Sequence, residues 1–260
     1  MKINEQLIEI QEHFGVISSE VILITGSIIL LILGILKTPL LWVKGVTAVV
    51  LLGCFIYVPK EQGLFFTQTI IRDNLSHLMN QLLPLVTFGV LCLKTQKHQS
   101  YEFYFLLISA LIGSLFMVGS HNLLILYLAI ELTSYSSYLL TGFDFNEKGS
   151  EAALKYLLFG GLSSAVMLFG ISLLYGVHHS LYFNTMEFSI LNATALLFFL
   201  SGLFFKTAIV PFHIWIPTTY QGAPTDVAAF FSTVPKIAGF VALYHVFKWT
   251  NELFNPSLSK

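Results

Sequence analysis

Residues 205–217 read FKTAIVPFHIWIP, and this stretch decides how the rest of the chain is interpreted. Lys206 lies inside an apolar run, and Pro211 and Pro217 bracket a histidine and a tryptophan. A second lysine, Lys236, is embedded in another apolar run, FSTVPKIAGFVALY, at residues 231–244. An ammonium group in apolar surroundings is costly, so each lysine needs a structural or a functional reason.

The composition places the chain in a lipid bilayer. Of its 260 residues, 55% are hydrophobic and only 10% are charged, whereas soluble domains carry about 25% charged residues. The net charge of -1 gives no case for binding nucleic acid. Cys54 and Cys92 lie in apolar runs without CxxC spacing, which predicts packing residues and no metal site. The polar N-terminal segment, residues 1–19, lacks the basic start of a signal peptide.

The apolar runs predict membrane-spanning helices, since a spanning helix needs about 20 mostly apolar residues. Helices satisfy their own backbone groups in hydrocarbon, and the alternating polarity of a membrane barrel is not seen. The predicted fold class is therefore an all-α integral membrane protein, a bundle of about eight transmembrane helices. The predicted spans are 20–36, 40–58, 75–93, 101–119, 121–142, 151–177, 190–210 and 225–247.

The seventh predicted helix is broken. Pro211, Pro217 and Pro224 each remove a backbone donor, and Gly222 adds a further interruption. Irregular backbone at membrane depth survives only where protein or a water-filled cavity surrounds it. The break therefore indicates a polar path near Lys206.

The lysines in the short connections predict the orientation. Lys37 and Lys44 flank the first connection, Lys94 and Lys97 lie in the third, and Lys148 lies in the fifth. The fourth and sixth connections carry no lysine or arginine. By the positive-inside rule the odd-numbered connections are cytoplasmic, so the N-terminus is expected on the outer side.

Glu131 lies in the middle of the fifth predicted span. Ser134, Tyr135 and Tyr138 follow at positions i+3, i+4 and i+7, which places a polar stripe on one face of an apolar helix. A carboxylate at this depth costs about 2.5–3.5 kcal/mol on insertion scales. Two readings are open: a structural carboxylate bonded to a neighbouring helix, or a proton or ion site that faces the bundle interior.

The two intramembrane lysines admit different readings. Lys206 lies near the end of its span, where a lysine side chain can reach the membrane interface. Lys236 has apolar sequence on both sides and follows Pro235, which frees a backbone carbonyl one turn back and predicts a helix break with a flexible joint. Burial makes a lysine able to exchange protons near neutral pH, which arginine cannot do. Both lysines are candidate proton carriers.

Three further residues are secondary candidates. Lys155 lies four residues after Glu151, a spacing that suits either a local ion pair or a supporting relay group. His213 could relay protons or bond a carbonyl freed by the prolines. Asp226 is a candidate N-cap for the helix that carries Lys236.

Two segments also carry a family resemblance. The run EAALKYLLFGGLSSAVMLFGISLLYG at 151–176 and the run FKTAIVPFHIWIPTTYQGAPTDVAAFFSTVPKIAGF at 205–240 resemble the antiporter-like, proton-translocating membrane subunits of respiratory complex I. The sister subunits and the multisubunit cation/proton antiporters share the VPFHxWxP core. The YxGAPT and xPKxAGF versions are most similar to the subunit N branch, the counterpart of mitochondrial subunit 2. The resemblance is strong from about residue 100 to 245.

The resemblance implies a proton relay. Glu131 matches a glutamate that pairs with a lysine matched by Lys206, and Lys236 matches the lysine that passes protons onward. It also implies that this chain binds no cofactor, while quinone, NADH, flavin and iron–sulfur clusters belong to partner subunits of the complex. The implied location is a bacterial inner (plasma) membrane.

The resemblance further implies the domain organisation and shows two departures. Residues 20–93 match three leading helices, residues 101–247 match the first of two inverted five-helix repeats, and residues 248–260 form a polar tail. The second repeat is absent, so we expect a fragment, a truncated product or half of a split subunit, with the missing half possibly on another chain. The acidic residue that usually follows WxP is replaced by Thr218 and Thr219. Two alternatives stay open: a subunit of a cation/proton antiporter, and a membrane scaffold without transport.

Overall fold

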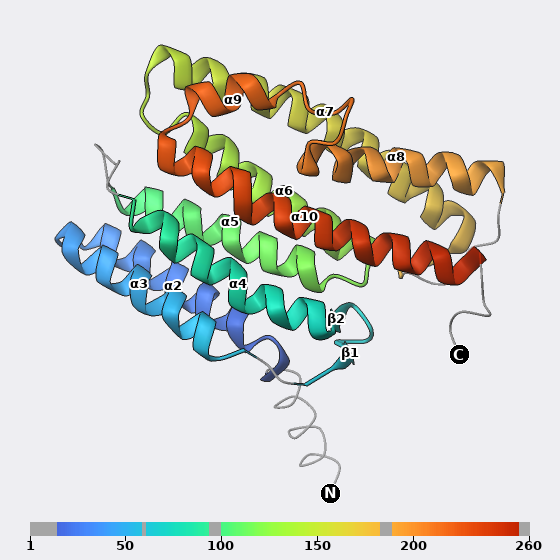
Figure 1. Cartoon of the computed structure of the whole chain (residues 1–260), viewed down its shortest axis with the longest axis horizontal. Helices are drawn as coiled ribbons and strands as arrows, with labels where there is room; N and C mark the ends of the chain where they lie inside the picture. The colour runs from blue at the N-terminus through green and yellow to red at the C-terminus, as the bar shows by residue number, and fades with distance from the viewer. Residues whose placement is uncertain (1–14, 59–60, 94–99, 183–188, 255–260) are drawn as a thin grey trace, which may run out of the picture.

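A computed structural model describes residues 15–58, 61–93, 100–182 and 189–254, the last four by their backbone alone. Within these ranges the chain forms a helical bundle with a small hairpin at one end (Figure 1). The elements are α2 (Ser18–Ile35), α3 (Leu40–Ile56), β1 (Gly63–Phe65), β2 (Ile70–Arg72), α4 (Asn74–Leu91), α5 (Tyr101–Gly119), α6 (Leu123–Thr141), α7 (Glu147–His178), α8 (Ile190–Thr207), α9 (Ile216–Gly222) and α10 (Thr225–Phe254).

The eight long helices coincide with the eight predicted spans. α5 has the predicted bounds of 101–119, and α8 begins at the predicted residue, Ile190. The largest difference is at α10, which continues to Phe254, beyond the predicted end of the span at residue 247. The predicted tail beyond 254 and residues 1–14 of the predicted N-terminal segment lie outside the described residues.

The helices have the length and composition of membrane spans. Six of the described helices, α2, α5, α6, α7, α8 and α10, are long and apolar enough to cross a bilayer, and α3 is a shorter apolar helix of 17 residues. α4 is also 18 residues long, but Ser76, Asn80 and Thr87 interrupt its apolar sequence and lie on its buried side. The chain is a multi-pass integral membrane protein.

The bundle has a central layer between two outer groups. Figure 1 shows α2 and α3 along one edge, α7, α8 and α9 along the other, and α4, α5, α6 and α10 between them. α5 is the most enclosed spanning helix, since 78% of its apolar window is buried, compared with 28% for α7. Exposed apolar side chains cover the outer helices, which is the surface expected where lipid is the solvent.

Side chains fix the start of several helices. Asp73, Asn122, Asn146 and Ser189 each accept a hydrogen bond from a backbone N–H in the first turn of the following helix. Such caps satisfy donors that have no partner within the helix. They also explain why polar residues recur just before the apolar runs.

The hairpin was not anticipated from the sequence. β1 and β2 pair antiparallel, with Gly63 opposite Arg72, and Ile70 forms a bridge to Ser120 after α5. A second bridge joins Asn122 and Tyr182. The hairpin, the end of α5 and the start of α6 therefore lie at one end of the bundle, called the hairpin end below.

The seventh span is broken, as predicted. α8 ends where Ala208 adopts a left-handed conformation with φ of 63°, and the peptide bond between Val210 and Pro211 is cis. The chain then turns back through residues 209–215 into α9, with Pro217 in its first turn. Pro224 separates α9 from α10.

Pro235 does not break its helix, which corrects the sequence-based expectation. α10 is helical on both sides of Pro235, and the ring is buried. The proline removes one backbone hydrogen bond, but packing against α4, α5 and α8 holds the helix on course.

Candidate functional site

Glu131 occupies the middle of α6 and is bonded to the neighbouring helix α7. Its Oε1 accepts a hydrogen bond from the hydroxyl of Ser164. The side chain is half-buried. The family resemblance implies Lys206 as the partner of Glu131, and Ser164 was not among the predicted site residues.

Lys206 lies in the last turn of α8 with its side chain inside the bundle, where only 2% of the residue is exposed. Its Nζ donates a hydrogen bond of 3.2 Å to Oγ of Ser134, a buried residue one turn beyond Glu131 on α6. Gly239 of α10 lies on the other side, because a Cβ built there would lie 3.8 Å from Cγ of Lys206.

Glu131 and Lys206 do not contact each other, although the family resemblance predicts a pair. Each charge has a serine partner instead, Ser164 for the carboxylate and Ser134 for the ammonium. The two serines belong to different helices. Since Glu131 and Ser134 are three residues apart on one helix, the two charged groups still meet at the same face of α6.

An aromatic cluster packs beside Lys206. The ring of Tyr156 from α7 stacks on Trp215, with 4.4 Å between the ring centroids and an interplanar angle of 4°. Tyr156 also packs edge-to-face with Tyr138 of α6, with 4.7 Å between the ring centroids. Trp215 Nε1 donates a hydrogen bond of 3.1 Å to the carbonyl oxygen of Phe205. The cluster joins α6, α7 and the broken segment, and it reaches Phe205, the residue before Lys206.

Lys236 lies midway along α10 and is half-buried. Its Nζ is 5.2 Å from the centre of the Tyr220 ring of α9, a cation–π distance. Within the described part of the chain, the Tyr220 hydroxyl is buried without a hydrogen-bond partner. The broken segment thus contacts Lys236 through Tyr220, and its Trp215 is hydrogen-bonded to Phe205, the residue before Lys206.

Asp226 is a buried acid whose importance sequence reasoning underestimated. It is the second residue of α10 and only 1% exposed. Its Oδ1 accepts from the N–H of Val227 at 2.9 Å, but Oδ2 has no partner among the described residues. The same holds for Oγ1 of Thr219, which is fully buried. This chain has Thr218 and Thr219 where the family usually has an acid, but a few residues further on Asp226 provides an acid in a buried position.

Lys155 forms the local ion pair that was one of its two readings. Its Nζ lies 2.5 Å from Oε1 of Glu151, and both side chains are exposed. The two residues line a cavity of about 450 Å³ with Lys148, Thr218 and Gln221. Lys155 is therefore separate from the buried lysines and faces a polar recess between α7 and α9.

Two other predicted residues point away from the buried charges. Tyr135 is 58% exposed, although Ser134 beside it is buried. His213 is exposed on the turn between α8 and α9, as is Pro211. The structure brings together Glu131, Ser134 and Lys206, with Lys236 close to the same broken segment.

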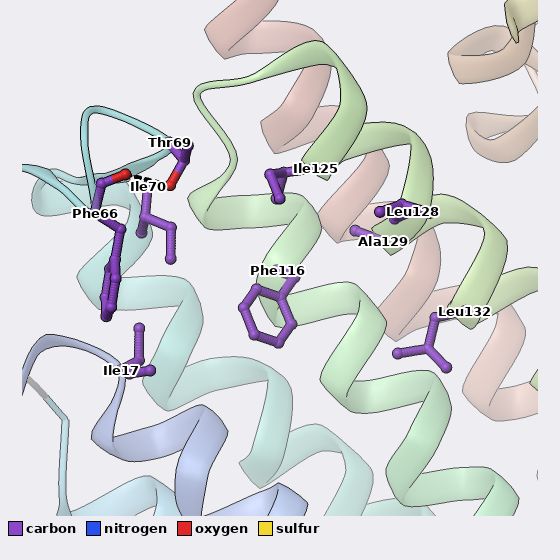
Figure 2. Close-up of a pocket in the computed structure, with 9 residues that line it drawn as sticks. All are labelled: Ile17, Phe66, Thr69, Ile70, Phe116, Ile125, Leu128, Ala129 and Leu132. Carbon is purple, nitrogen blue, oxygen red and sulfur yellow. Dashed lines mark hydrogen bonds between the residues drawn. The ribbon is translucent and has the colours of Figure 1, made fainter. Parts of the chain in front are cut away.

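An apolar groove lies on another face of the bundle (Figure 2). Its volume is about 370 Å³, and its side chains come from the start of α2, the hairpin, α5 and α6: Ile17, Phe66, Thr69, Ile70, Phe116, Ile125, Leu128, Ala129 and Leu132. None of these residues is ionisable. The groove shares helix α6 with Glu131 but has no part in the charged site.

Comparison with known proteins places this geometry in a family. Residues 120–256 match the family model described as "NADH:quinone oxidoreductase/Mrp antiporter, TM". The chain is 36% identical over 257 residues to NADH-quinone oxidoreductase subunit N of Bartonella bacilliformis, with 92% of this chain and 52% of that relative covered. It is 41% identical over 187 residues to subunit N of Magnetococcus marinus, covering 68% of this chain and 38% of that protein.

Solved structures share the fold. A chain of respiratory complex I from Thermus thermophilus with bound aureothin superposes with a TM-score of 0.80 at 33% identity, covering 87% of this chain and 52% of that one. A chain of the Mrp complex from Dietzia sp. DQ12-45-1b superposes with a TM-score of 0.72 at 20% identity, covering 91% of this chain and 48% of that one, which shows a common fold alone.

The chain thus spans about half the length of these relatives. The matched segment contains the Glu131 helix, Lys206, Lys236 and the broken segment between the two lysines. The chain belongs to the NADH:quinone oxidoreductase/Mrp antiporter transmembrane family.

Proposed function

We propose that this chain is a proton-translocating membrane subunit of an NADH:quinone oxidoreductase, in which Glu131, Lys206 and Lys236 relay protons. The observation that carries the proposal is the Lys206 ammonium, which is 2% exposed and donates to Ser134 on the helix that holds Glu131. A buried cation inside a membrane is a functional site by default, because insertion is costly and a packing role does not require charge.

The serine partners suit a site that gains and loses protons. A hydroxyl group can accept a hydrogen bond from an ammonium or donate one to a neutral amine. Ser134 can therefore serve Lys206 in both protonation states, whereas a permanent carboxylate contact would favour only the charged one. Ser164 has the same freedom toward Glu131.

The relay runs through the broken seventh span. Lys206 lies just before the break, and the ring of Tyr220 on α9 lies under Lys236. The buried hydroxyls of Thr219 and Tyr220 and the free oxygen of Asp226 supply polar groups near the same segment. A proton leaving Lys206 would pass along these groups, or water held by them, to Lys236.

The redox chemistry is assigned to other subunits. The energy for transport would come from quinone reduction with electrons from NADH, and flavin and iron–sulfur clusters would lie in those partners. The described residues contain no group of three or more His, Cys, Asp or Glu placed to hold a metal. Complex I subunits are the expected partners.

We also propose a bacterial inner membrane, with the N-terminus outside. Support comes from the lysines at the α2–α3 and α6–α7 connections, Lys37 and Lys148, which lie away from the hairpin end. The relatives compared are bacterial proteins. A protease or tag accessible from the outer side at the N-terminus of intact cells would test the orientation.

The test is to replace Lys206, Lys236 or Glu131 in the assembled complex and reconstitute it in vesicles. Lys206→Ala and Lys236→Ala should lower the number of protons moved for each quinone reduced. Lys44→Ala, which removes an exposed lysine on α3, is the matched control and should leave that ratio unchanged. An unchanged ratio in all three site variants would leave a structural scaffold as the remaining interpretation.

The cation/proton antiporter reading is the second candidate. The relatives named as subunit N are 36% and 41% identical, whereas the Mrp chain is 20% identical and shows only the fold. Sodium movement that depends on Lys206, together with purification free of flavin and iron–sulfur subunits, would favour the antiporter.

A further inference from the structure

A polar recess and an apolar cavity follow each other along one face of α7. The recess is the space of about 450 Å³ that Lys148, Glu151 and Lys155 line together with Thr218 and Gln221 of α9. The apolar cavity, of about 190 Å³, has walls from α7 and from the turn before α9: Phe159, Leu162, Val166, Phe212, Ile214 and Trp215. Figure 1 shows α9 beside the first part of α7. The broken segment, residues 209–222, thus lines both spaces.

The α7 residues of the two spaces form one straight stripe. Lys148, Lys155, Phe159 and Val166 follow one another at intervals of seven, four and seven residues. Since 18 residues make five complete turns of an α-helix, Lys148 and Val166 project from the same side of α7, about 27 Å apart along its axis. The lining changes from charged to apolar between Lys155 and Phe159.

This change falls near the level of the lipid headgroups. α7 has 32 residues, so it is about 48 Å long, whereas the hydrocarbon core of a bilayer is about 30 Å thick. A helix centred in the bilayer therefore extends about six residues beyond the core at each end, which places Lys148 and Glu151 among the headgroups. Lys155 lies within one turn of that level, and its side chain can extend to it. From Lys155 to Val166 the helix rises about 16 Å, close to the thickness of one leaflet, about 15 Å.

The recess has a net positive charge. Its lining holds two ammonium groups against one carboxylate, and that carboxylate, Glu151, is paired with Lys155. Lys148 is exposed and has no carboxylate partner among the described residues. The Gln221 amide adds two further N–H donors. A phosphate group, which accepts several hydrogen bonds and carries negative charge, matches this set of donors.

The walls of the site are packed together, and its outer side is open. A Cβ built on Gly222 would lie 2.4 Å from Cβ of Ala152, so the end of α9 touches α7 beside the recess. Phe159 and Leu162 are 44% and 66% exposed. Of the six described helices long and apolar enough to span a bilayer, α7 is also the least buried. Lipid can therefore enter the site from the side of the bundle.

We propose that this composite site binds an anionic phospholipid, with the phosphate in the recess and an acyl chain in the apolar cavity. Lys148, Lys155 and Gln221 donate to the phosphate oxygens, as in other basic pockets between membrane helices. The lipid ties the start of α7 to the broken segment, because both line the two spaces. The proposal goes beyond the proton relay and does not depend on it, since it rests on charge, shape and depth alone.

Quenching of Trp215 by brominated lipids tests the position of the acyl chain. The 260-residue chain with Trp42→Phe and Trp249→Phe keeps Trp215 as its only tryptophan. It is reconstituted in phosphatidylcholine bilayers that contain an equal amount of either phosphatidylglycerol or phosphatidylcholine with brominated acyl chains. The brominated phosphatidylglycerol should quench Trp215 more strongly, with a binding constant several-fold above that of phosphatidylcholine. Equal quenching by the two lipids would overturn the proposal.

Charge variants of the same protein test the headgroup contacts. Lys148→Gln should lower the preference for phosphatidylglycerol roughly fivefold, the factor for one lysine at a membrane surface. Glu151→Gln should raise the preference, because it removes the negative charge and releases Lys155. Lys44→Gln is the matched control, since Lys44 is exposed in the first turn of α3, on the same side of the membrane, and it should leave the preference unchanged.

Two results would count against this assignment. A preference that Lys148→Gln does not change, or that Lys44→Gln lowers to the same extent, would show that the recess does not hold the phosphate. Quenching that disappears when the same chain is assembled into the complex would show that a partner subunit, and not a lipid, covers the site.

Discussion

The contact between α7 and α8 depends on Gly170, and replacement by alanine tests it. A Cβ built at Gly170 would lie 2.4 Å from the backbone nitrogen of Phe199 and 2.7 Å from the carbonyl oxygen of Ala195. Ordinary contact between such atoms begins at about 3.5 Å, so the two backbones must separate by about 1 Å. α7 carries Ser164 and α8 carries Lys206, so the same contact sets the spacing of the charged site.

Gly161 provides a matched control on the same helix. No described atom lies within 4 Å of a Cβ at this position. Alanine improves helix propensity by about 0.8–1.0 kcal/mol at either glycine. Overpacking at Gly170 costs about 1–3 kcal/mol, because the atoms met are backbone and cannot rotate away. The difference between the two variants isolates the packing cost.

The measurement is thermal unfolding of the purified protein in detergent, followed by tryptophan fluorescence. A loss of 1 kcal/mol lowers Tm by about 2–4 °C in proteins of 150–250 residues, so Gly170→Ala should melt roughly 2–12 °C below Gly161→Ala. If Gly170→Ala melted at or above the control, the close approach of α7 and α8 would be refuted.

Two further predictions concern the hairpin end. Arg72 and Glu20 form a buried ion pair with an N–O distance of 2.5 Å. Arg72→Met should lower the free energy of unfolding by about 3–5 kcal/mol, because the Glu20 carboxylate stays buried without its charge partner. Adding Glu20→Leu should restore most of the stability in the same melting assay. A double variant no more stable than the single one would contradict this. Burial opposes ionisation of Asp73, but the N–H of Ser76 and nearby positive charge hold the pKa of Asp73 below its usual value. A lowered pKa stabilises the fold above the unfolded value of about 3.9 and loses this effect as the pH falls through the folded value. Asp73→Ala should therefore lower Tm at pH 7 and make a smaller difference at the lowest pH. Asp73→Asn, which keeps the capping oxygen but not the charge, should have a Tm between those of the parent and Asp73→Ala at pH 7. A difference in Tm that does not change with pH would contradict the reasoning.

The fold could be predicted from the sequence because the bilayer imposes simple rules. Apolar length, and the need to satisfy every backbone group, identify helices without knowledge of their packing. The bounds of α5 and α8 follow from such runs, and the prolines after Ala208 predict the break in the seventh span. Pro235 shows the limit of local rules, since a proline inside a packed helix is held in place by its neighbours.

The site could be predicted by residue type but not by contact. Glu131, Lys206 and Lys236 were found because charge in an apolar run is rare. Tyr135 was grouped with Ser134 because neighbouring positions lie close on a helix. A rotation of about 100° per residue nevertheless separates a buried hydroxyl from a ring that is 58% exposed. Which of the two faces the lysine depends on the position of α8.

The polar groups that sequence reasoning missed are of two kinds: uncharged residues inside helices, and residues that resemble helix caps. Ser164 and Asn80 are ordinary residues in a helix, and Asp226 resembles a capping residue before an apolar run. Their importance lies in burial, which only tertiary structure provides: Asn80 is fully buried and Asp226 is 1% exposed. Since desolvation is what makes a polar group costly, a serine inside the bundle can determine the path of a proton as strongly as a lysine does. The buried charges identify which helices take part, and the buried neutral groups decide how those charges can be connected.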